Sequence, residues 1–203
     1  MIMKLIHCII VAFYYLQMVR FVPAYVIFMF KRPLLLPDFM VWKKYLCHEH
    51  ESDTKAFFLI FAKYKEYRFV FYYRLGYDSR AISWIAPPDP TIHCITPLIG
   101  NGFYINHGHS TRMNAKSIGA NFQIWQNVTI GVKTQFNNGT RPTIGNNVRI
   151  CSGAVVCGDI TIGDNVTIGA NSVVMKSVPD NCVVVGNPAR IVYRDGTRCD
   201  EKL

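Results

Sequence analysis

The sequence lacks long runs of like charge. Its net charge is +9, yet basic residues are adjacent only in short pairs such as Lys31–Arg32 and Lys43–Lys44. No motif that reads nucleic-acid sequence is present, so we expect no nucleic-acid partner, and the positive charge suits an anionic ligand or an anionic membrane surface better. A solvated basic surface without a partner is the alternative.

The sequence also lacks a paired cysteine framework. Its seven cysteines are odd in number and widely spaced, as expected for reduced thiols in a cytoplasmic protein. The segment Cys47–His48–Glu49–His50 contains metal-ligand residue types. Four adjacent side chains cannot converge on one ion from a helix or a strand, however, so we expect no metal site there.

The N-terminal apolar stretch, residues 5–30, lacks a small-residue cleavage site, which disfavours a removable signal peptide. Arg20 lies near its middle, where a charge in hydrocarbon costs about 2.5–3.5 kcal/mol. We therefore expect residues 1–32 to lie in the interface of the cytoplasmic membrane face, or on the protein's own apolar surface, rather than to span a bilayer.

An apolar residue recurs at every sixth position in the C-terminal half. Six is neither a helix period nor a strand alternation, and it predicts a parallel β-helix in which three hexads form one triangular coil. An ordinary sandwich of short strands would not keep so strict a period. The recurring residues are Ile118, Ile124 and Ile130, followed by Ile144, Ile150, Val156, Ile162, Ile168 and Val174.

Proline positions suggest how the chain is divided. Pro33 and Pro37 are expected to end the apolar segment, and residues 87–90, with three prolines, form the clearest linker. We expect an apolar segment at 1–36, a helical region with linker at 37–90, a β-helix domain at 91–186 and a tail at 187–203. The fold class is therefore mainly β with an α-helical N-terminal region.

Two places break the hexad phase. Between Ile105 and Ile118 the spacing is off by one residue, and the stretch 106–109 with its two histidines lies there. Residues 132–142 are polar and too long for the coil, so we expect them to form an extruded loop. Irregular loops on a rigid scaffold commonly carry function, which makes these two places the candidate site.

On these residues the chain resembles the hexapeptide-repeat acyltransferases, and within them the serine acetyltransferase branch. The N-terminal part is similar to a shorter variety of this branch, often encoded with bacterial surface-polysaccharide genes. The resemblance implies a left-handed β-helix, homotrimers, and acetyl-coenzyme A (acetyl-CoA) in a groove between neighbouring prisms. The similar stretches are residues 102–107, 126–131, 141–145 and 178–190 in the coil, and Asp38, Trp42 and residues 68–74 before it.

The resemblance places His107 at the catalytic position. A neutral imidazole can take the proton of an acceptor hydroxyl as its oxygen attacks the thioester. His109 is the rival, since the phase slip leaves the alignment open by a residue or two. The structural alternative is that both histidines only form hydrogen bonds across a coil corner.

The acceptor-binding positions depart from the serine enzymes. Those enzymes carry an acid beside the histidine and an Arg-His pair at the end of the loop, whereas this chain has Asn106, and Thr140 followed by Arg141. A neutral amide offers no charge to an ammonium group but still binds a sugar hydroxyl. We therefore favour O-acetylation of a sugar in surface-polysaccharide biosynthesis, with serine O-acetylation and a non-catalytic scaffold as alternatives.

Binding of coenzyme A needs small residues along a groove and cations at its phosphates. Each small residue also has a structural reason to be small. The candidates are Gly131, Ser152, Gly153, Ala154 and Ala170 for the groove, with Lys176 and Arg190 for the phosphates.

Overall fold

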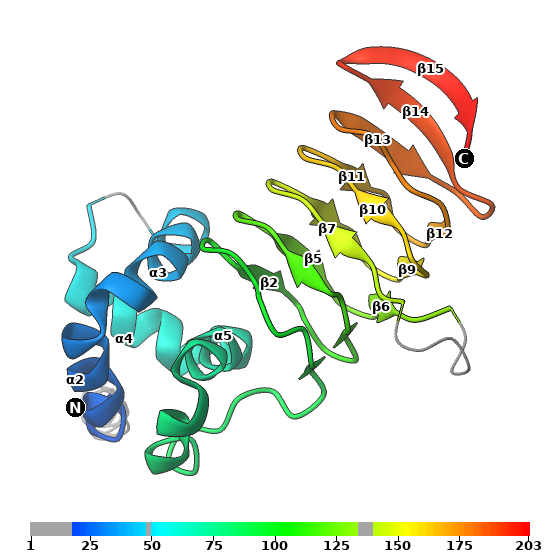
Figure 1. Cartoon of the computed structure of the whole chain (residues 1–203). Coiled ribbons are helices and arrows are strands. Elements are labelled where there is room, and N and C mark those ends of the chain that lie inside the picture. Colours follow the sequence, from blue (N-terminus) through cyan, green and yellow to red (C-terminus); the bar gives the residue numbers. More distant parts are fainter. Residues whose placement is uncertain (1–17, 48–49, 134–139) are drawn as a thin grey trace, which may run out of the picture. The chain divides into compact units, whose positions relative to one another are not determined.

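The computed structural model describes residues 18–47, 50–133 and 140–203. The chain forms two compact units, residues 1–88 and 89–203 (Figure 1). Their boundary falls within the proline-rich segment 87–90. Proline limits the backbone there to extended and turn conformations, so neither a helix nor a coil continues across it.

The N-terminal unit packs its helices around an aromatic core. Phe57 and Phe61 of one helix stack with their ring centroids 5.2 Å apart, and both side chains are fully buried. Large rings bury much apolar surface per residue, which suits a unit this small. Its described elements are α2 (Val22–Phe30), α3 (Arg32–Leu46), α4 (Asp53–Lys63), α5 (Lys65–Leu75) and the 3-10 helix η1 (Gly76–Ala81).

Helix α3 runs through both prolines that were expected to end the apolar segment. Pro33 lies in its first turn, where a helix leaves backbone N–H groups unpaired in any case. Pro37 lies inside the helix and removes one hydrogen bond. The break comes instead at Lys31, between α2 and α3, and not at residue 36.

A buried ion pair joins α3 to α5. The guanidinium of Arg74 donates two hydrogen bonds to the carboxylate of Asp38, at 2.7 and 3.1 Å. Both side chains are almost wholly removed from solvent. In this bidentate pair, each charged group supplies hydrogen bonds that replace the water its partner loses on burial.

The C-terminal unit is a left-handed parallel β-helix with three sheets, as the hexads and the resemblance predicted. Successive strands of each sheet stack side by side along the prism (Figure 1). Sheet A contains β1 (His93–Cys94), β3 (Arg112–Met113), β6 (Thr129–Gly131), β9 (Val155–Cys157) and β12 (Val173–Val174). Sheet B contains β4 (Ser117–Ile118), β7 (Thr143–Ile144) and β10 (Thr161–Ile162). Sheet C contains β2 (Tyr104–Asn106), β5 (Gln123–Trp125), β8 (Arg149–Ile150), β11 (Thr167–Ile168), β13 (Cys182–Val185), β14 (Arg190–Arg194) and β15 (Thr197–Lys202).

The hexad residues form the core of the prism. Ile124 pairs with Ile150, and Ile150 with Ile168, so equal residues lie above one another in successive coils. All three side chains are fully buried. Identical branched side chains stacked at the spacing of strands form a continuous core along the prism.

A ladder of side-chain amides follows the corner between sheets B and C. Each member has a positive φ, which asparagine adopts more readily than most residues. Each amide nitrogen donates to the oxygen of the next member at 2.9 Å. The members are Asn121, Asn147, Asn165, Asn181 and the final acceptor Asp195.

Residues 187–203 are not a loose tail. Strands β14 and β15 form an antiparallel hairpin that pairs with β13 and extends sheet C. The ammonium of Lys176 donates to the backbone oxygen of Leu203 at 2.8 Å, which holds the end of the chain against the coil. Most of residues 190–202 are therefore strand residues of sheet C.

Candidate active site

The histidine stretch is a bulged corner between sheets C and A. Ile105 pairs with Ile124 and Met113 with Ile130, so eight positions cross this corner where the next coil uses six. The following step, from Met113 to Ile118, is one residue short of a hexad. The interval from Ile105 to Ile118 is one residue longer than two hexads because its first step has two extra residues and its second step has one too few. The two extra residues are in the step that contains the histidines.

Both histidines project from this bulge into solvent, while the residue between them is buried. His107 has a φ of 52°, an uncommon conformation for a residue other than glycine. A Cβ on Gly108 would lie 2.3 Å from Cγ2 of Ile105 and 2.9 Å from Cδ1 of Ile92. Glycine at 108 therefore lets the backbone lie directly on the core, while the residues on both sides of it, His107 and His109, are exposed.

Backbone hydrogen bonds hold the bulge. The N–H of His109 donates to the carbonyl of His107 at 2.9 Å, and the N–H of Asn127 donates to the carbonyl of His109 at 3.0 Å. Within the described part of the chain, neither imidazole has a hydrogen-bond or ion-pair partner. A strained backbone that presents an unengaged imidazole is typical of a functional position.

Asp89, in the proline-rich segment 87–90, is connected to the histidine corner by hydrogen bonds. Asp89 accepts hydrogen bonds from both the backbone N–H and the hydroxyl of Thr91, at 2.8 and 2.7 Å. The hydroxyl oxygen of Thr91 accepts the N–H of Ser110 at 3.0 Å. Asp89 thus lies two hydrogen bonds from the histidine corner. The sequence does contain this acidic residue directly before the first coil, but the prolines around it indicated only a linker.

Asn106 and Arg141 lie at different corners. Asn106 ends β2, beside the histidines, and is half-buried. Arg141 donates to the side-chain oxygen of Asn114 at 3.4 Å, and Asn114 directly follows β3. The histidines come before β3, and Asn114 comes after it. Within one chain, the histidines and Arg141 therefore lie at opposite ends of the strands of sheet A. Residues 134–139 of the expected loop lie outside the described part of the chain.

Three of the candidate groove residues stack below the histidine corner. The N–H of Gly153 donates to the carbonyl of Gln126, and the N–H of Asn171, beside Ala170, donates to that of Ser152. Ala154, in contrast, is fully buried and presents no side chain to a groove. It is small because it packs in the prism core.

The remaining groove candidate and the two phosphate candidates lie elsewhere. Gly131 ends β6, at the far side of sheet A from the histidines. Lys176 is hydrogen-bonded to Leu203, and Arg190 is paired with Asp200 at 2.5 Å. Either cation would have to exchange its present partner to bind a phosphate.

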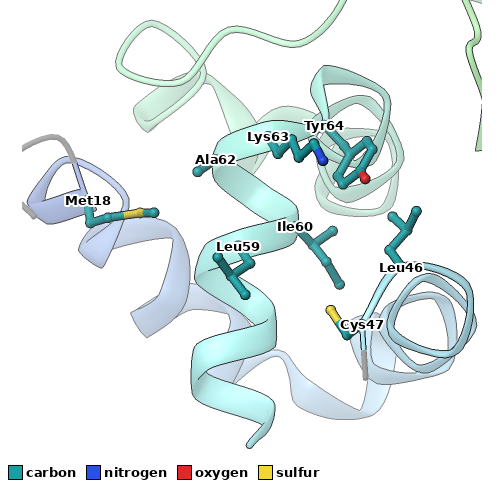
Figure 2. A pocket seen from close by; sticks show the side chains of 8 residues that line it. All are labelled: Met18, Leu46, Cys47, Leu59, Ile60, Ala62, Lys63 and Tyr64. Carbon is teal, nitrogen blue, oxygen red and sulfur yellow. The ribbon is translucent and has the colours of Figure 1, made fainter. Parts of the chain in front are cut away.

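A cavity of about 250 Å³ lies in the N-terminal unit. Its wall includes Leu46, Ile60 and the thiol of Cys47, with Lys63 and Tyr64 at one side (Figure 2). Burial first, and then the carboxylate of Glu51, raise the pKa of the Cys47 thiol. The thiol therefore stays protonated at neutral pH and is a poor nucleophile.

Among the described residues no group of three or more His, Cys, Asp or Glu side chains could hold a metal ion. His48 and Glu49, from the segment 47–50 with its metal-ligand residue types, lie outside the described residues. In the same part of the chain, no helix is long and apolar enough to cross a bilayer.

Comparisons with known proteins agree with the geometry of the coil. The family model for the bacterial transferase hexapeptide (six repeats) matches residues 141–176. Serine acetyltransferase of Synechococcus elongatus is 43% identical over 103 residues, which is 50% of this chain and 42% of that protein. That of Staphylococcus xylosus is 46% identical over 101 residues, 49% of this chain and 47% of that protein. The coil is thus similar to bacterial hexapeptide transferases and to serine acetyltransferases.

A solved structure shares the fold of this chain. The structure of serine acetyltransferase from Brucella abortus in complex with coenzyme A has the same fold, with a TM-score of 0.61. That match is 24% identical and covers 80% of this chain and 68% of that one. The matched part of the chain spans about half the length of the curated relatives.

Proposed function

We propose that the chain is an O-acetyltransferase that uses acetyl-CoA and has His107 as its general base. The observation that carries this proposal is the bulged corner, which presents an imidazole without a partner at a positive φ. The serine acetyltransferase relatives support the same reaction class. Because the six described cysteines are unpaired, we place the protein in the cytoplasm.

In the proposed reaction, Nε2 or Nδ1 of His107 takes the proton of the acceptor hydroxyl as its oxygen attacks the thioester carbonyl carbon. The tetrahedral intermediate then expels the coenzyme A thiolate, which receives the proton from the imidazolium. No covalent enzyme intermediate is needed. Backbone N–H groups near the loop at 132–142 would stabilise the oxyanion.

For the acceptor we now favour L-serine over a sugar. Both relatives compared above are named serine acetyltransferases, and each matches about half of the chain. Asn106 leaves the corner without the acid expected beside the histidine. Asp89, joined to the corner through Thr91 and Ser110, supplies a carboxylate that can pair with an ammonium group.

A sugar hydroxyl of a surface polysaccharide or its precursor is the second candidate. The neutral side chain of Asn106 favours it, since an amide donates to and accepts from hydroxyl groups without preferring a cation. Arg141 would then bind a carboxylate or phosphate of the sugar.

A homotrimer would explain why these groups lie at separate corners. In one chain sheet A separates Arg141 from the histidine corner, whereas a neighbouring prism would bring its own Arg141 corner to this chain's His107. Coenzyme A would then lie in the groove between prisms, along Ser152, Gly153 and Ala170 and against Gly131 of the neighbour.

The test compares His107→Ala, His109→Ala and the wild-type chain by thiol release from acetyl-CoA. We expect His107→Ala to lower kcat/KM about 10²- to 10⁴-fold and His109→Ala less than about tenfold. Unchanged turnover in His107→Ala would reject His107 as the general base, whereas no thiol release by the wild-type chain with any acceptor would leave the scaffold alternative. Offering L-serine beside a panel of sugars and nucleotide sugars then identifies the acceptor, and turnover with sugars alone would reject serine.

A further inference from the structure

Helix α2 (Val22–Phe30) has one buried face and one exposed apolar face. Phe21, Ala24 and Phe28 recur at helical spacing and pack into the aromatic core of the unit. The opposite side carries large apolar side chains that are exposed, up to Phe30 at 82%. This outer face of α2 consists of Val19, Val22, Val26, Met29 and Phe30.

The outer face is continuous and free of charge. Its members recur at intervals of three and four residues, so they lie on one side of the helix. No charged residue occurs between Arg20 and Lys31. Contiguous apolar surface of this kind is rare on a soluble protein unless something binds it.

Cations flank this face at both ends. Arg20 comes directly after Val19 and is exposed, and its guanidinium carbon lies 4.6 Å from the centroid of the Phe21 ring. The ammonium of Lys31 is 54% exposed and lies 3.9 Å from Asp78, a loose contact. Residues 1–88 carry twelve Lys or Arg and six Asp or Glu, so the whole unit is cationic.

Helix length decides how such a helix would meet a bilayer. Nine residues rise about 14 Å, roughly half of the 30 Å hydrocarbon core. Pro23 limits the helix at one end and Lys31 at the other. A short helix with an apolar face and flanking cations lies in the interface, with its cations among the head groups.

We propose that α2 binds an anionic phospholipid surface in the plane of the interface, through its outer face, with Arg20 and Lys31 paired to lipid phosphates. This membrane contact is independent of acetyl transfer. It refines the expectation for residues 1–32 by assigning the contact to one helix face.

The experiment is flotation of the full chain with vesicles of phosphatidylcholine, with and without phosphatidylglycerol. Val26→Asp combined with Met29→Asp places charge in the middle of the face and is expected to lower the partition coefficient at least tenfold. Leu98→Asp is the matched control: it adds charge at an exposed aliphatic side chain of the other unit and should bind as the wild type does.

A second pair, Arg20→Gln and Lys31→Gln, tests the charge contribution. Each is expected to weaken binding to phosphatidylglycerol vesicles about fivefold, with little effect on neutral ones. The proposal is wrong if the wild-type chain does not float with anionic vesicles at low salt, or if Leu98→Asp loses as much binding as the α2 variant. It is also wrong if the α2 variant keeps vesicle binding but changes the molar mass by light scattering, because a second copy then covers the face. Thermal melting followed by circular dichroism confirms that each variant is folded.

Discussion

The side-chain amide of Asn147 donates to the amide oxygen of Asn165 at 2.9 Å and accepts from Asn121 at the same distance. Asn147 therefore connects three coils while its own backbone has a φ of 54°. Two physical effects, the ladder and the left-handed conformation, meet in one residue and can be separated by substitution.

Asn147→Gly removes the ladder but tolerates the positive φ, and we expect it to lower the free energy of unfolding by about 1 kcal/mol. Asn147→Ala loses both and should cost about 2 kcal/mol. Urea unfolding followed by circular dichroism measures the difference. Equal losses in the two variants would show that backbone conformation contributes nothing at this corner.

Gly108→Ala should disturb the histidine corner. The added methyl would lie 2.3 Å from the Ile105 side chain, so either the core or the bulge must move. We expect a loss of about 1–3 kcal/mol in stability and a fall in kcat/KM, because His107 moves with its neighbour. A variant with full activity and wild-type melting would contradict the packing described for this turn.

Gly131→Ala should leave folding unchanged, since the nearest atom to the added methyl is the Cβ of Asn114 at 4.0 Å. If Gly131 lines the coenzyme A groove, the same methyl raises KM for acetyl-CoA about tenfold or more. Initial rates at varied acetyl-CoA, beside a melting curve, separate the two effects. A wild-type KM would remove Gly131 from the proposed groove.

Asp89→Asn tests how the acceptor is held. With L-serine we expect KM to rise about tenfold and kcat to change little, because a charge-assisted contact to the ammonium is lost. Asp159→Asn, an exposed acid of the same unit, is the matched control and should be neutral. An unchanged KM for serine would separate Asp89 from the acceptor site.

Acid should weaken the link between α3 and α4. A hydrogen bond from Lys43 at 2.8 Å, with Arg32 nearby, holds the pKa of Asp53 below its usual value. Its stabilising effect is therefore complete above the ordinary aspartate range, about 3.9, and is lost as pH falls through the lowered folded-state pKa. Melting curves of wild type and Asp53→Asn should differ at pH 6 and converge toward pH 3. A gap that does not narrow at all between pH 6 and pH 3 would assign the effect to packing.

The prism was predictable because its signal is redundant. Ile124, Ile150 and Ile168 repeat one environment in three coils, so period alone identifies the core. The histidine corner was also located from the sequence, but its geometry was not. A slip of one residue does not reveal a gain of two and a loss of one, and only strand register places that gain before Met113.

Contacts between residues that are separated in the sequence could not be predicted from it. Lys176 and Arg190 have the right charge for a phosphate, yet their partners, Leu203 and Asp200, lie in or beyond a hairpin that has no hexad pattern. Pro37 stays within α3 because the packing of Phe39 and Trp42 outweighs one lost hydrogen bond. The intrinsic secondary-structure propensity of the single residues predicts neither effect.

The hairpin that closes sheet C also bears on self-association. An open coil would present unpaired strand edges on which another prism could continue as a filament. Strand β15 (Thr197–Lys202) places Arg198, Asp200, Glu201 and Lys202 along that outer edge. A strand that carries so many charged side chains is a poor template for another strand, so β15 opposes growth of sheet C from end to end.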